Sequence, residues 1–253
     1  MSDRIGEVTS AIETSPGLAI CAYVTAGYPG KDAFLDILAS VAHSADVVEI
    51  GVPFTDPMAD GLTIQEASRL ALAGGVDLGW ILDTVGEADL DAPVLLMGYY
   101  NPFLAFGLEN LVARMTETGV AGLIVPDLPL EESGPLTGLL DRSGQGLVQL
   151  VAPTTPPDRL RLLATASRGF VYAVAATGIT GGTTRFDPAV LDYLDRVRHV
   201  ASLPVLAGFG VREREQVTRL AGHVDGVVVG SALIDAIDRG DDPAHFLTML
   251  RPE

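Results

Sequence analysis

The sequence contains the run Val47-Val48-Glu49-Ile50-Gly51, in which one carboxylate interrupts an otherwise apolar stretch. Short, mostly apolar runs, bounded by Gly, Pro and Asp, recur along the whole chain. Because most of them are continuously apolar rather than alternating, they predict parallel strands that are buried on both faces. The eight runs are 18–24, 47–51, 93–97, 122–125, 147–151, 169–174, 204–207 and 226–229.

Stretches with helical periodicity lie between these runs, for example at 33–43, 108–118, 158–167 and 212–220. Eight strand–helix units in a chain of 253 residues predict a (β/α)8 TIM barrel that forms one catalytic domain over residues 1–253. A doubly wound open sheet is the alternative. It is disfavoured because no GxGxxG fingerprint follows the first run.

The composition excludes several classes of protein. The chain has 33 acidic and 16 basic residues and a formal net charge of −17, which argues against binding to nucleic acid or to anionic membranes. Cys21 is the single cysteine, so no intrachain disulfide or thiolate metal cluster can form, and we expect it to be a small buried hydrophobe. The polar, acidic start of the chain does not resemble a signal peptide, and no apolar stretch of 18 residues predicts a membrane span. We therefore expect a cytoplasmic protein.

The two longest intervals between strand starts follow the second and the sixth run, which directs attention to 53–73 and 177–188. Active sites of barrels lie on the loops at the carboxyl ends of the strands. Glu49 stands at such an end, where it is either a solvated rim residue or a general acid/base with a raised pKa. Asp56 and Asp60 follow, and each alone is a common turn residue, but two carboxylates beside Glu49 favour acid–base roles.

Glycine-rich segments follow the last three runs: Gly178-Ile179-Thr180-Gly181, Gly208-Phe209-Gly210 and Gly230-Ser231. Barrels bind phosphate at these places through backbone N–H groups and a helix N-terminus, which requires no lysine. Lys31 is the only lysine and lies outside the strands, which argues against a Schiff-base aldolase. The four histidines lie away from the strand ends, so we expect no metal site. The sequence thus predicts acid–base chemistry on a phosphorylated substrate. Tyr172 and Asp127 are either structural or further site residues.

The residues from Val48 to Gly61, including Glu49-Ile50-Gly51-Val52-Pro53-Phe54-Thr55-Asp56-Pro57-Met58-Ala59-Asp60, closely resemble the signature of the tryptophan synthase α subunit family. The similarity extends over most of the chain. It includes the segments 23–29, 96–102 and 125–129 and the three glycine-rich segments. The resemblance implies retro-aldol cleavage of indole-3-glycerol phosphate to indole and glyceraldehyde 3-phosphate, without a cofactor on this chain.

The resemblance also implies individual roles. Glu49 is expected to be the general acid/base, Asp60 the carboxylate that holds the indole N–H, and Tyr172 a tyrosine beside the glycerol chain. The positions implied for phosphate binding are Gly181, Gly210, Gly230 and Ser231. The residues implied to line the indole pocket are Tyr23, Leu96, Ile124 and Phe209.

A partner is implied as well: a β subunit that carries pyridoxal phosphate, in an α2β2 assembly, with Pro53 and Asp56 as candidate contacts. The sequence departs from the family pattern at Leu62, Ala175 and 182–185, which lie near loops that face this partner. These departures leave two alternatives open. One is a stand-alone indole-3-glycerol phosphate lyase, and the other is a weakly catalytic regulatory partner of a β-like subunit.

Overall fold

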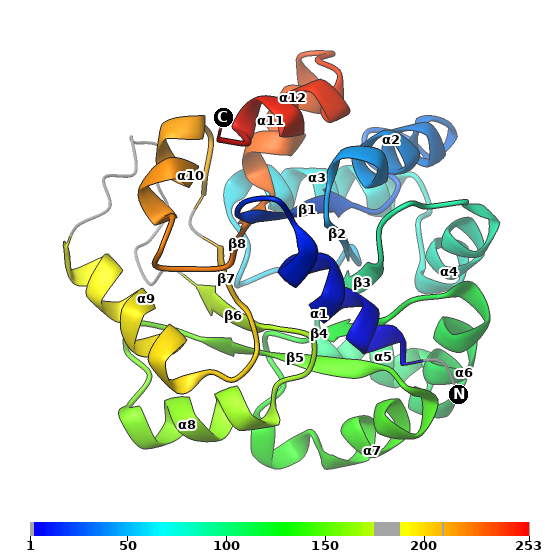
Figure 1. Ribbon diagram of the computed structural model, residues 1–253. Helices are drawn as coiled ribbons and strands as arrows, with labels where there is room; N and C mark the ends of the chain where they lie inside the picture. Colours follow the sequence, from blue (N-terminus) through cyan, green and yellow to red (C-terminus); the bar gives the residue numbers. More distant parts are fainter. Residues whose placement is uncertain (1–2, 175–187, 209, 253) are drawn as a thin grey trace.

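The computed structural model describes residues 3–174, 188–208 and 210–252. Eight parallel strands form a closed barrel in which each strand pairs with the next along the chain and β8 pairs with β1 (Figure 1). The closed barrel confirms the predicted (β/α)8 TIM fold and excludes the open sheet. The strands are β1 (Ala19–Thr25), β2 (Val47–Gly51), β3 (Val94–Met97), β4 (Gly122–Ile124), β5 (Gly146–Val151), β6 (Val171–Val174), β7 (Val205–Gly208) and β8 (Gly226–Val229).

Helices surround the barrel, and α1 lies across one end of it (Figure 1). The helices before β5 are α1 (Arg4–Thr14), α2 (Lys31–Ser44), α3 (Leu62–Ala73), α4 (Leu78–Glu87), α5 (Tyr100–Phe106), α6 (Leu108–Thr118), the 3-10 turn η1 (Leu130–Glu132) and α7 (Gly134–Ser143). The helices after β5 are α8 (Pro157–Ala166), α9 (Pro188–Val200), α10 (Arg214–Leu220), α11 (Ser231–Asp238) and α12 (Pro243–Leu250).

The ends of most predicted elements differ from the observed ends by one or two residues, and local backbone geometry explains two of these differences. The run 169–174 begins as a strand only at Val171, because Gly169 has a φ of +80° and the Phe170 N–H bonds to the Arg168 carbonyl in a turn. The stretch 212–220 becomes helical only at Arg214, since Glu213 and Gln216 form a capping box. The strands at 47–51 and 226–229 and the helix at 108–118 have the predicted bounds.

The core has two layers, because successive strand side chains point to opposite faces of the sheet. Ile20, Ala22 and Val24 of β1 belong to the outer layer between strands and helices, whereas Cys21 and Tyr23 belong to the barrel interior. Ile5, Val8 and Ile12 of α1 join the interior layer and close the end of the barrel where the strands begin. Glycines make room for α1: a Cβ at Gly146 would lie 2.5 Å from Ile5 Cγ1.

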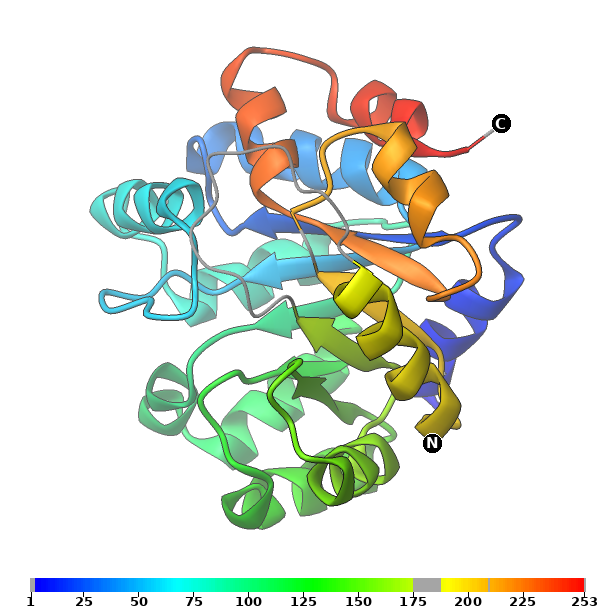
Figure 2. The ribbon, with the colours of Figure 1, turned by 90° about the vertical axis from the view of Figure 1, so that its left-hand side faces the viewer.

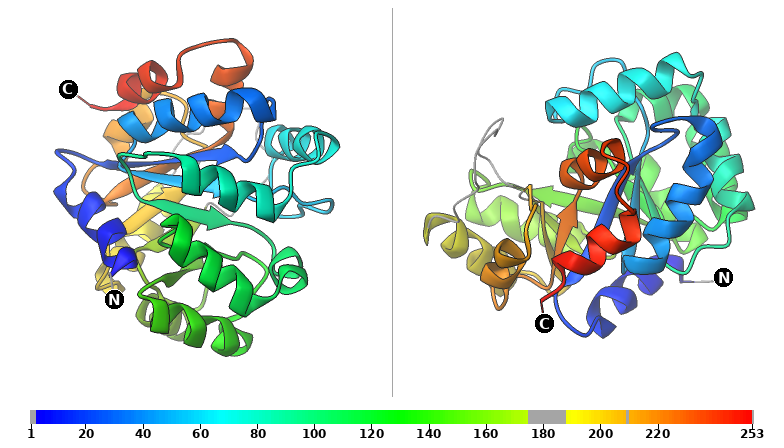
Figure 3. Two further views of the ribbon diagram at one scale, coloured as in Figure 1. Left: turned by 90° about the vertical axis from the view of Figure 1, so that its right-hand side faces the viewer. Right: turned by 90° about the horizontal axis from the view of Figure 1, so that it is seen from above.

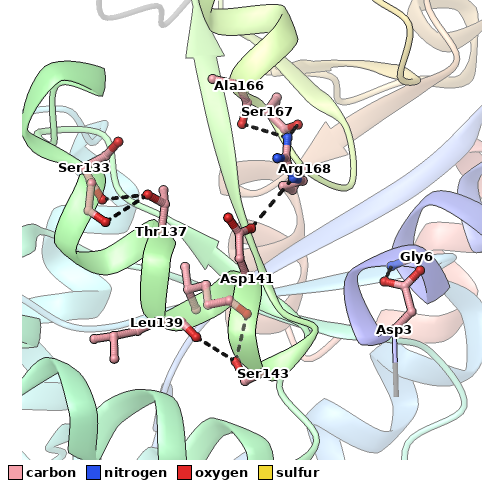
Figure 4. A network of polar contacts seen from close by, with 12 residues as sticks. Asp3, Gly6, Ser133, Thr137, Leu139, Asp141, Ser143, Ala166, Ser167 and Arg168 are labelled. Carbon is pink, nitrogen blue, oxygen red and sulfur yellow. Dashed lines mark hydrogen bonds and ion pairs between the residues drawn. The ribbon is translucent and has the colours of Figure 1, made fainter. Parts of the chain in front are cut away.

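The two ends of the barrel differ in their structure. In Figure 2 the strand arrowheads point toward the end from which the β2–α3 loop projects, and α1 lies at the opposite end; Figure 3 shows the same arrangement from the other side. The end with α1 carries structural polar contacts, such as the Asp3 cap of α1 and the Arg168–Asp141 ion pair at 3.9 Å (Figure 4). Because this ion pair is solvent-exposed, its contribution to stability is small.

Candidate active site

A cavity of about 510 Å³ opens at the carboxyl ends of the strands. This is the end at which TIM barrels place their active sites. Its walls come from most of the strands and from the loop after β2. The lining residues are Tyr23, Glu49, Ala59, Asp60, Gly61, Ile64, Met97, Pro126, Leu150, Tyr172, Val174, Gly208, Gly210, Val228, Gly230 and Ser231.

Glu49 lies in β2 and is fully buried at the wall of this cavity. Burial raises the pKa of its carboxyl from the ordinary value to about 8, and the negative charge of Asp60 adds to this effect. The Cys21 Sγ lies 3.9 Å from Oε2 and donates a weak hydrogen bond that lowers the pKa. Oε1 has no hydrogen-bond partner among the described residues. A buried carboxyl with one unused oxygen beside a cavity is well suited to exchange a proton with a ligand.

Asp60 faces the same cavity from the end of the β2–α3 loop. Its Oδ2 accepts a hydrogen bond from the Tyr99 hydroxyl at 3.1 Å, and its backbone carbonyl accepts one from Gln65 Nε2 at 2.8 Å. Burial raises the pKa of Asp60, whereas the hydrogen bond from Tyr99 lowers it. The two carboxyl groups therefore lie in different environments: the described residues offer Glu49 only the weak thiol donor, whereas a hydroxyl holds Asp60.

Two buried tyrosines also line the cavity, and glycines on neighbouring strands provide space for their rings. A Cβ at Gly208 would lie 2.6 Å from Tyr172 Cε1, and a Cβ at Gly51 would lie 2.1 Å from the Tyr23 hydroxyl oxygen. Burial, more than any nearby charge, raises the pKa of both tyrosines, so both stay neutral near pH 7. Each can therefore act as a neutral hydroxyl donor.

Three of the predicted phosphate-binding residues come together at the cavity: Gly210, Gly230 and Ser231. Gly210 has a φ of +63°, a conformation that favours glycine. Gly230 is the N-cap of α11 and Ser231 is its first residue. The first backbone N–H groups of a helix have no partner within the helix, so this end of α11 offers donors to an anion. The fourth residue, Gly181, lies outside the described residues.

Among the described residues that were predicted for the apolar pocket, only Tyr23 lines the cavity. Leu96 is buried in the outer layer against the helices, because it pairs with Ile50 rather than with the inward-facing Glu49. Met97, the next residue of β3, lines the cavity instead. Ile124 belongs to the barrel interior but does not line the cavity, and Phe209 lies outside the described residues.

The predicted partner contacts lie in the loop after β2. Pro53 is buried, whereas Asp56 is exposed and accepts a hydrogen bond from the Thr55 hydroxyl at 2.6 Å. Met58 in the same loop is 91% exposed. Asp127 has a structural contact rather than a place in the cavity, since its Oδ1 accepts a hydrogen bond from the Tyr100 N–H at 2.9 Å.

The structure adds Tyr99 to the residues predicted from the sequence. Its hydroxyl contacts Asp60, and its ring stacks on Phe54 with the centroids 5.0 Å apart. The segment 96–102 was part of the resemblance, but nothing in the sequence pattern distinguishes Tyr99 from Tyr100. Within the described residues, no group of three or more His, Cys, Asp or Glu side chains could hold a metal ion. No helix in this part of the chain is both long and apolar enough to cross a membrane.

Comparison with known proteins identifies the family. Residues 10–250 match the family described as Tryptophan synthase alpha chain. The chain belongs to this family. The tryptophan synthase alpha chain of Solidesulfovibrio magneticus is 44% identical over 92% of this chain and 92% of its own length. That of Chloroflexus aggregans is 39% identical over 94% of this chain and 90% of its own length.

Solved structures give the same result. The structure of Mycobacterium tuberculosis tryptophan synthase in space group F222 superposes with a TM-score of 0.89 and 32% identity, and covers 100% of both chains. A structure of the tryptophan synthase α2β2 complex from Pyrococcus furiosus superposes with a TM-score of 0.85 and 36% identity, and covers 92% of this chain and 97% of that one. Tryptophan synthase alpha chains are lyases of tryptophan biosynthesis that cleave indole-3-glycerol phosphate. They bind no cofactor themselves, and pyridoxal phosphate is bound by the β subunit.

Proposed function

We propose that this chain is the α subunit of a tryptophan synthase and cleaves indole-3-glycerol phosphate to indole and glyceraldehyde 3-phosphate. The observation that carries this proposal is the buried Glu49 carboxyl on the wall of a cavity that the N-terminus of α11 also lines. Its pKa is raised, and its Oε1 has no hydrogen-bond partner in the part of the chain that the structure describes. A substrate that has a phosphate at one end and a carbon that accepts a proton at the other fits this arrangement.

In the proposed reaction, protonated Glu49 gives its proton to indole C3 and generates a cationic indoleninium ring. The chain hydroxyl next to C3 then loses its proton to the Glu49 carboxylate, and the bond between C3 and the hydroxyl-bearing carbon breaks. Its electrons return to the ring to give neutral indole, and the hydroxyl-bearing carbon becomes the aldehyde of glyceraldehyde 3-phosphate. Glu49 ends the cycle protonated, so no net proton is required.

The remaining residues are proposed to bind and orient the substrate. Asp60 accepts the indole N–H and stabilises the ring as positive charge develops, because a fixed carboxylate favours the charged state over the neutral one. The Tyr172 hydroxyl lies beside Gly208 at the side of the cavity where we place the glycerol chain. Gly210, Gly230 and Ser231 hold the phosphate, and Tyr23 and Met97 pack against the indole ring. We keep Gly181 and Phe209 as expected contacts on the basis of the resemblance alone.

The pH dependence of turnover tests the role of Glu49. Because the cycle begins with the protonated carboxyl and its pKa is raised to about 8, we expect kcat/KM to be highest below this value and to fall as the pH rises through 8. The measurement is a pH series of indole release by the isolated chain. A profile that rises through pH 8, as for a residue that must be ionised first, contradicts the assignment.

We propose that the partner β subunit covers the β2–α3 loop in an α2β2 assembly. The expected contacts Pro53 and Asp56 share this loop with Met58, which is 91% exposed, and Leu62 at the start of α3 is 73% exposed. Two large apolar side chains this exposed within five residues of the sequence support a surface that a partner covers.

Replacing Met58 by aspartate is expected to weaken association with the β subunit, because the variant buries a charge at the proposed interface. The measurement is the β concentration that gives half-maximal stimulation of indole release, which we expect to rise at least about tenfold. Leu162→Asp is the matched control, since Leu162 is 57% exposed on α8 and far from this loop in the chain. Equal effects of the two variants contradict the proposed interface.

We further propose that residues 1–253 work as one catalytic domain and that the enzyme acts in the cytoplasm. Closure of the barrel by pairing of β8 with β1 supports the first statement. The free, buried thiol of Cys21 is compatible with the second. Fractionation of cells with an antibody against the chain tests the location. Recovery of the protein with a secreted or membrane fraction contradicts it.

A further inference from the structure

Tyr99 connects two loops at the mouth of the cavity. It lies two residues after the end of β3, is the N-cap of α5 and is 8% exposed. Its hydroxyl oxygen lies 2.8 Å from the Ala59 backbone nitrogen and 3.1 Å from Asp60 Oδ2. Its ring stacks on Phe54, with an angle of 27° between the ring planes. One side chain thus contacts the β2–α3 loop near its start and at its end.

The hydrogen bonds of the Tyr99 hydroxyl determine where its proton points. The Ala59 N–H can only donate, so the hydroxyl oxygen accepts there. The single hydroxyl proton is then directed to Asp60 Oδ2. Burial, together with the negative charge of Asp60, raises the pKa of Tyr99, so the hydroxyl remains a neutral donor near pH 7. This hydrogen bond favours the ionised form of Asp60, whereas burial opposes it and raises the pKa of the carboxyl overall.

The rest of the loop has few anchors among the described residues. The Met58 N–H bonds to the Asp56 carbonyl and the Asp60 N–H bonds to the Pro57 carbonyl, and both bonds are internal turns of the loop. Gln65 of α3 holds the Asp60 carbonyl but not its carboxylate. The direction of the Asp60 side chain therefore depends on Tyr99, a residue that lies 39 positions further along the chain.

We propose that Tyr99 is a positioning residue that aims the Asp60 carboxylate at the indole nitrogen of the substrate. Because its ring stacks on Phe54, Tyr99 also makes the direction of the Asp60 side chain depend on the position of residues 53–56. This inference rests on the proposed function, because it requires both the indole substrate and a partner on the β2–α3 loop. A β subunit that shifts residues 53–56 then changes the placement of Asp60 through one rigid aromatic side chain.

The test compares Tyr99→Phe with wild type and with Tyr100→Phe, which makes the same chemical change in the adjacent residue. Tyr99→Phe keeps the ring and its stacking on Phe54, so the fold should be retained, and a melting curve checks this. We expect kcat to fall at least tenfold while KM changes less than threefold, since a carboxylate that acts on developing charge contributes mainly to the transition state. Tyr100→Phe is expected to keep the wild-type values.

The pH profile separates positioning from a merely structural role. The titratable groups that face Asp60 are Glu49 on β2, Tyr23 on β1, Tyr172 on β6 and Tyr99 itself, and Asp127 lies near Tyr99. All except Tyr99 are unchanged in the variant. Loss of the donated hydrogen bond raises the pKa of Asp60, so the acid limb of kcat/KM should move to higher pH by at least about half a unit. We also expect the β subunit to stimulate the variant less than wild type.

The outcomes are distinguishable. If wild type releases indole and Tyr99→Phe matches it in kcat, in acid limb and in stimulation by the β subunit, the inference is wrong. If kcat falls without any shift of the acid limb, Tyr99 has only a structural role and the inference is again wrong. If wild type releases no indole with or without the β subunit, the proposed function itself fails.

Discussion

Replacing Glu49 by glutamine is expected to lower kcat for indole-3-glycerol phosphate cleavage by about 10²–10⁴-fold, the usual contribution of a positioned acid or base. Glutamine has nearly the same shape but cannot give a proton to indole C3. Because the phosphate and indole contacts lie elsewhere, the Kd of the substrate should change little. Single-turnover kinetics and equilibrium binding measure the two quantities separately, and Glu87→Gln on the exposed face of α4 is the control.

Although Glu49→Gln should lower activity, it should raise the free energy of unfolding at high pH. The pKa of Glu49 is about 8 in the folded protein and near 4.5 in an unfolded chain. Folded protein therefore binds more protons between these values, and the free energy of unfolding falls as the pH rises through this range. Glutamine removes this cost, so the variant should be more stable than wild type at pH 9 and similar to it below pH 4.5. Thermal or urea unfolding at pH 9 measures this difference. A variant that keeps its activity contradicts the acid/base role of Glu49, and a variant that is less stable than wild type at pH 9 contradicts its burial.

Replacing Asp60 by asparagine is expected to lower kcat by about 10²–10³-fold, as is typical when an electrostatic contact to developing charge is removed. The amide can still accept the indole N–H, but it cannot balance the positive charge of the protonated ring. It also presents an NH₂ group or a neutral oxygen to the Tyr99 hydroxyl, in place of the present 3.1 Å contact with a carboxylate. KM should change much less than kcat.

The measurement for this variant is kcat and KM for indole release, with Asp36→Asn on the exposed side of α2 as the control. Glu49 lies close enough for the Asp60 charge to raise its pKa. The alkaline limb of the pH profile should therefore move to lower pH when that charge is removed. Unchanged kcat with a raised KM would show that Asp60 only binds substrate, which contradicts its proposed role.

Much of the fold could be predicted from the sequence, because buried parallel strands leave an apolar pattern that is readable locally. Glu49 could be predicted for the same reason: a carboxylate inside the run 47–51 contrasts with its neighbours. The place of Gly210 and Gly230 at the cavity could be predicted because barrels place their binding loops after the last strands, whereas phosphate binding by them stays a prediction. The start of β6 at Val171 could not be predicted, because the positive φ of Gly169 interrupts the extended backbone and is not evident from the amino-acid sequence.

The remaining site residues depend on register and closure, which a local pattern does not contain. Leu96 and Met97 are equally apolar, and only the pairing of Glu49 with Leu95 decides that Met97 faces the cavity. Tyr99 and Asp60 are brought together by adjacent strand ends rather than by sequence spacing. Cys21 was predicted to be buried and is buried, but its contact with Glu49 requires the β1–β2 register that pairs Tyr23 with Glu49.

Indole release from indole-3-glycerol phosphate by the purified chain, measured with and without a tryptophan synthase β subunit, tests the central claim most directly. We expect slow release by the isolated chain, strong stimulation by the β subunit, and loss of both with Glu49→Gln. Fast release that the β subunit does not change would indicate a stand-alone lyase. No release under either condition would contradict the proposed reaction and leave a regulatory partner as the alternative.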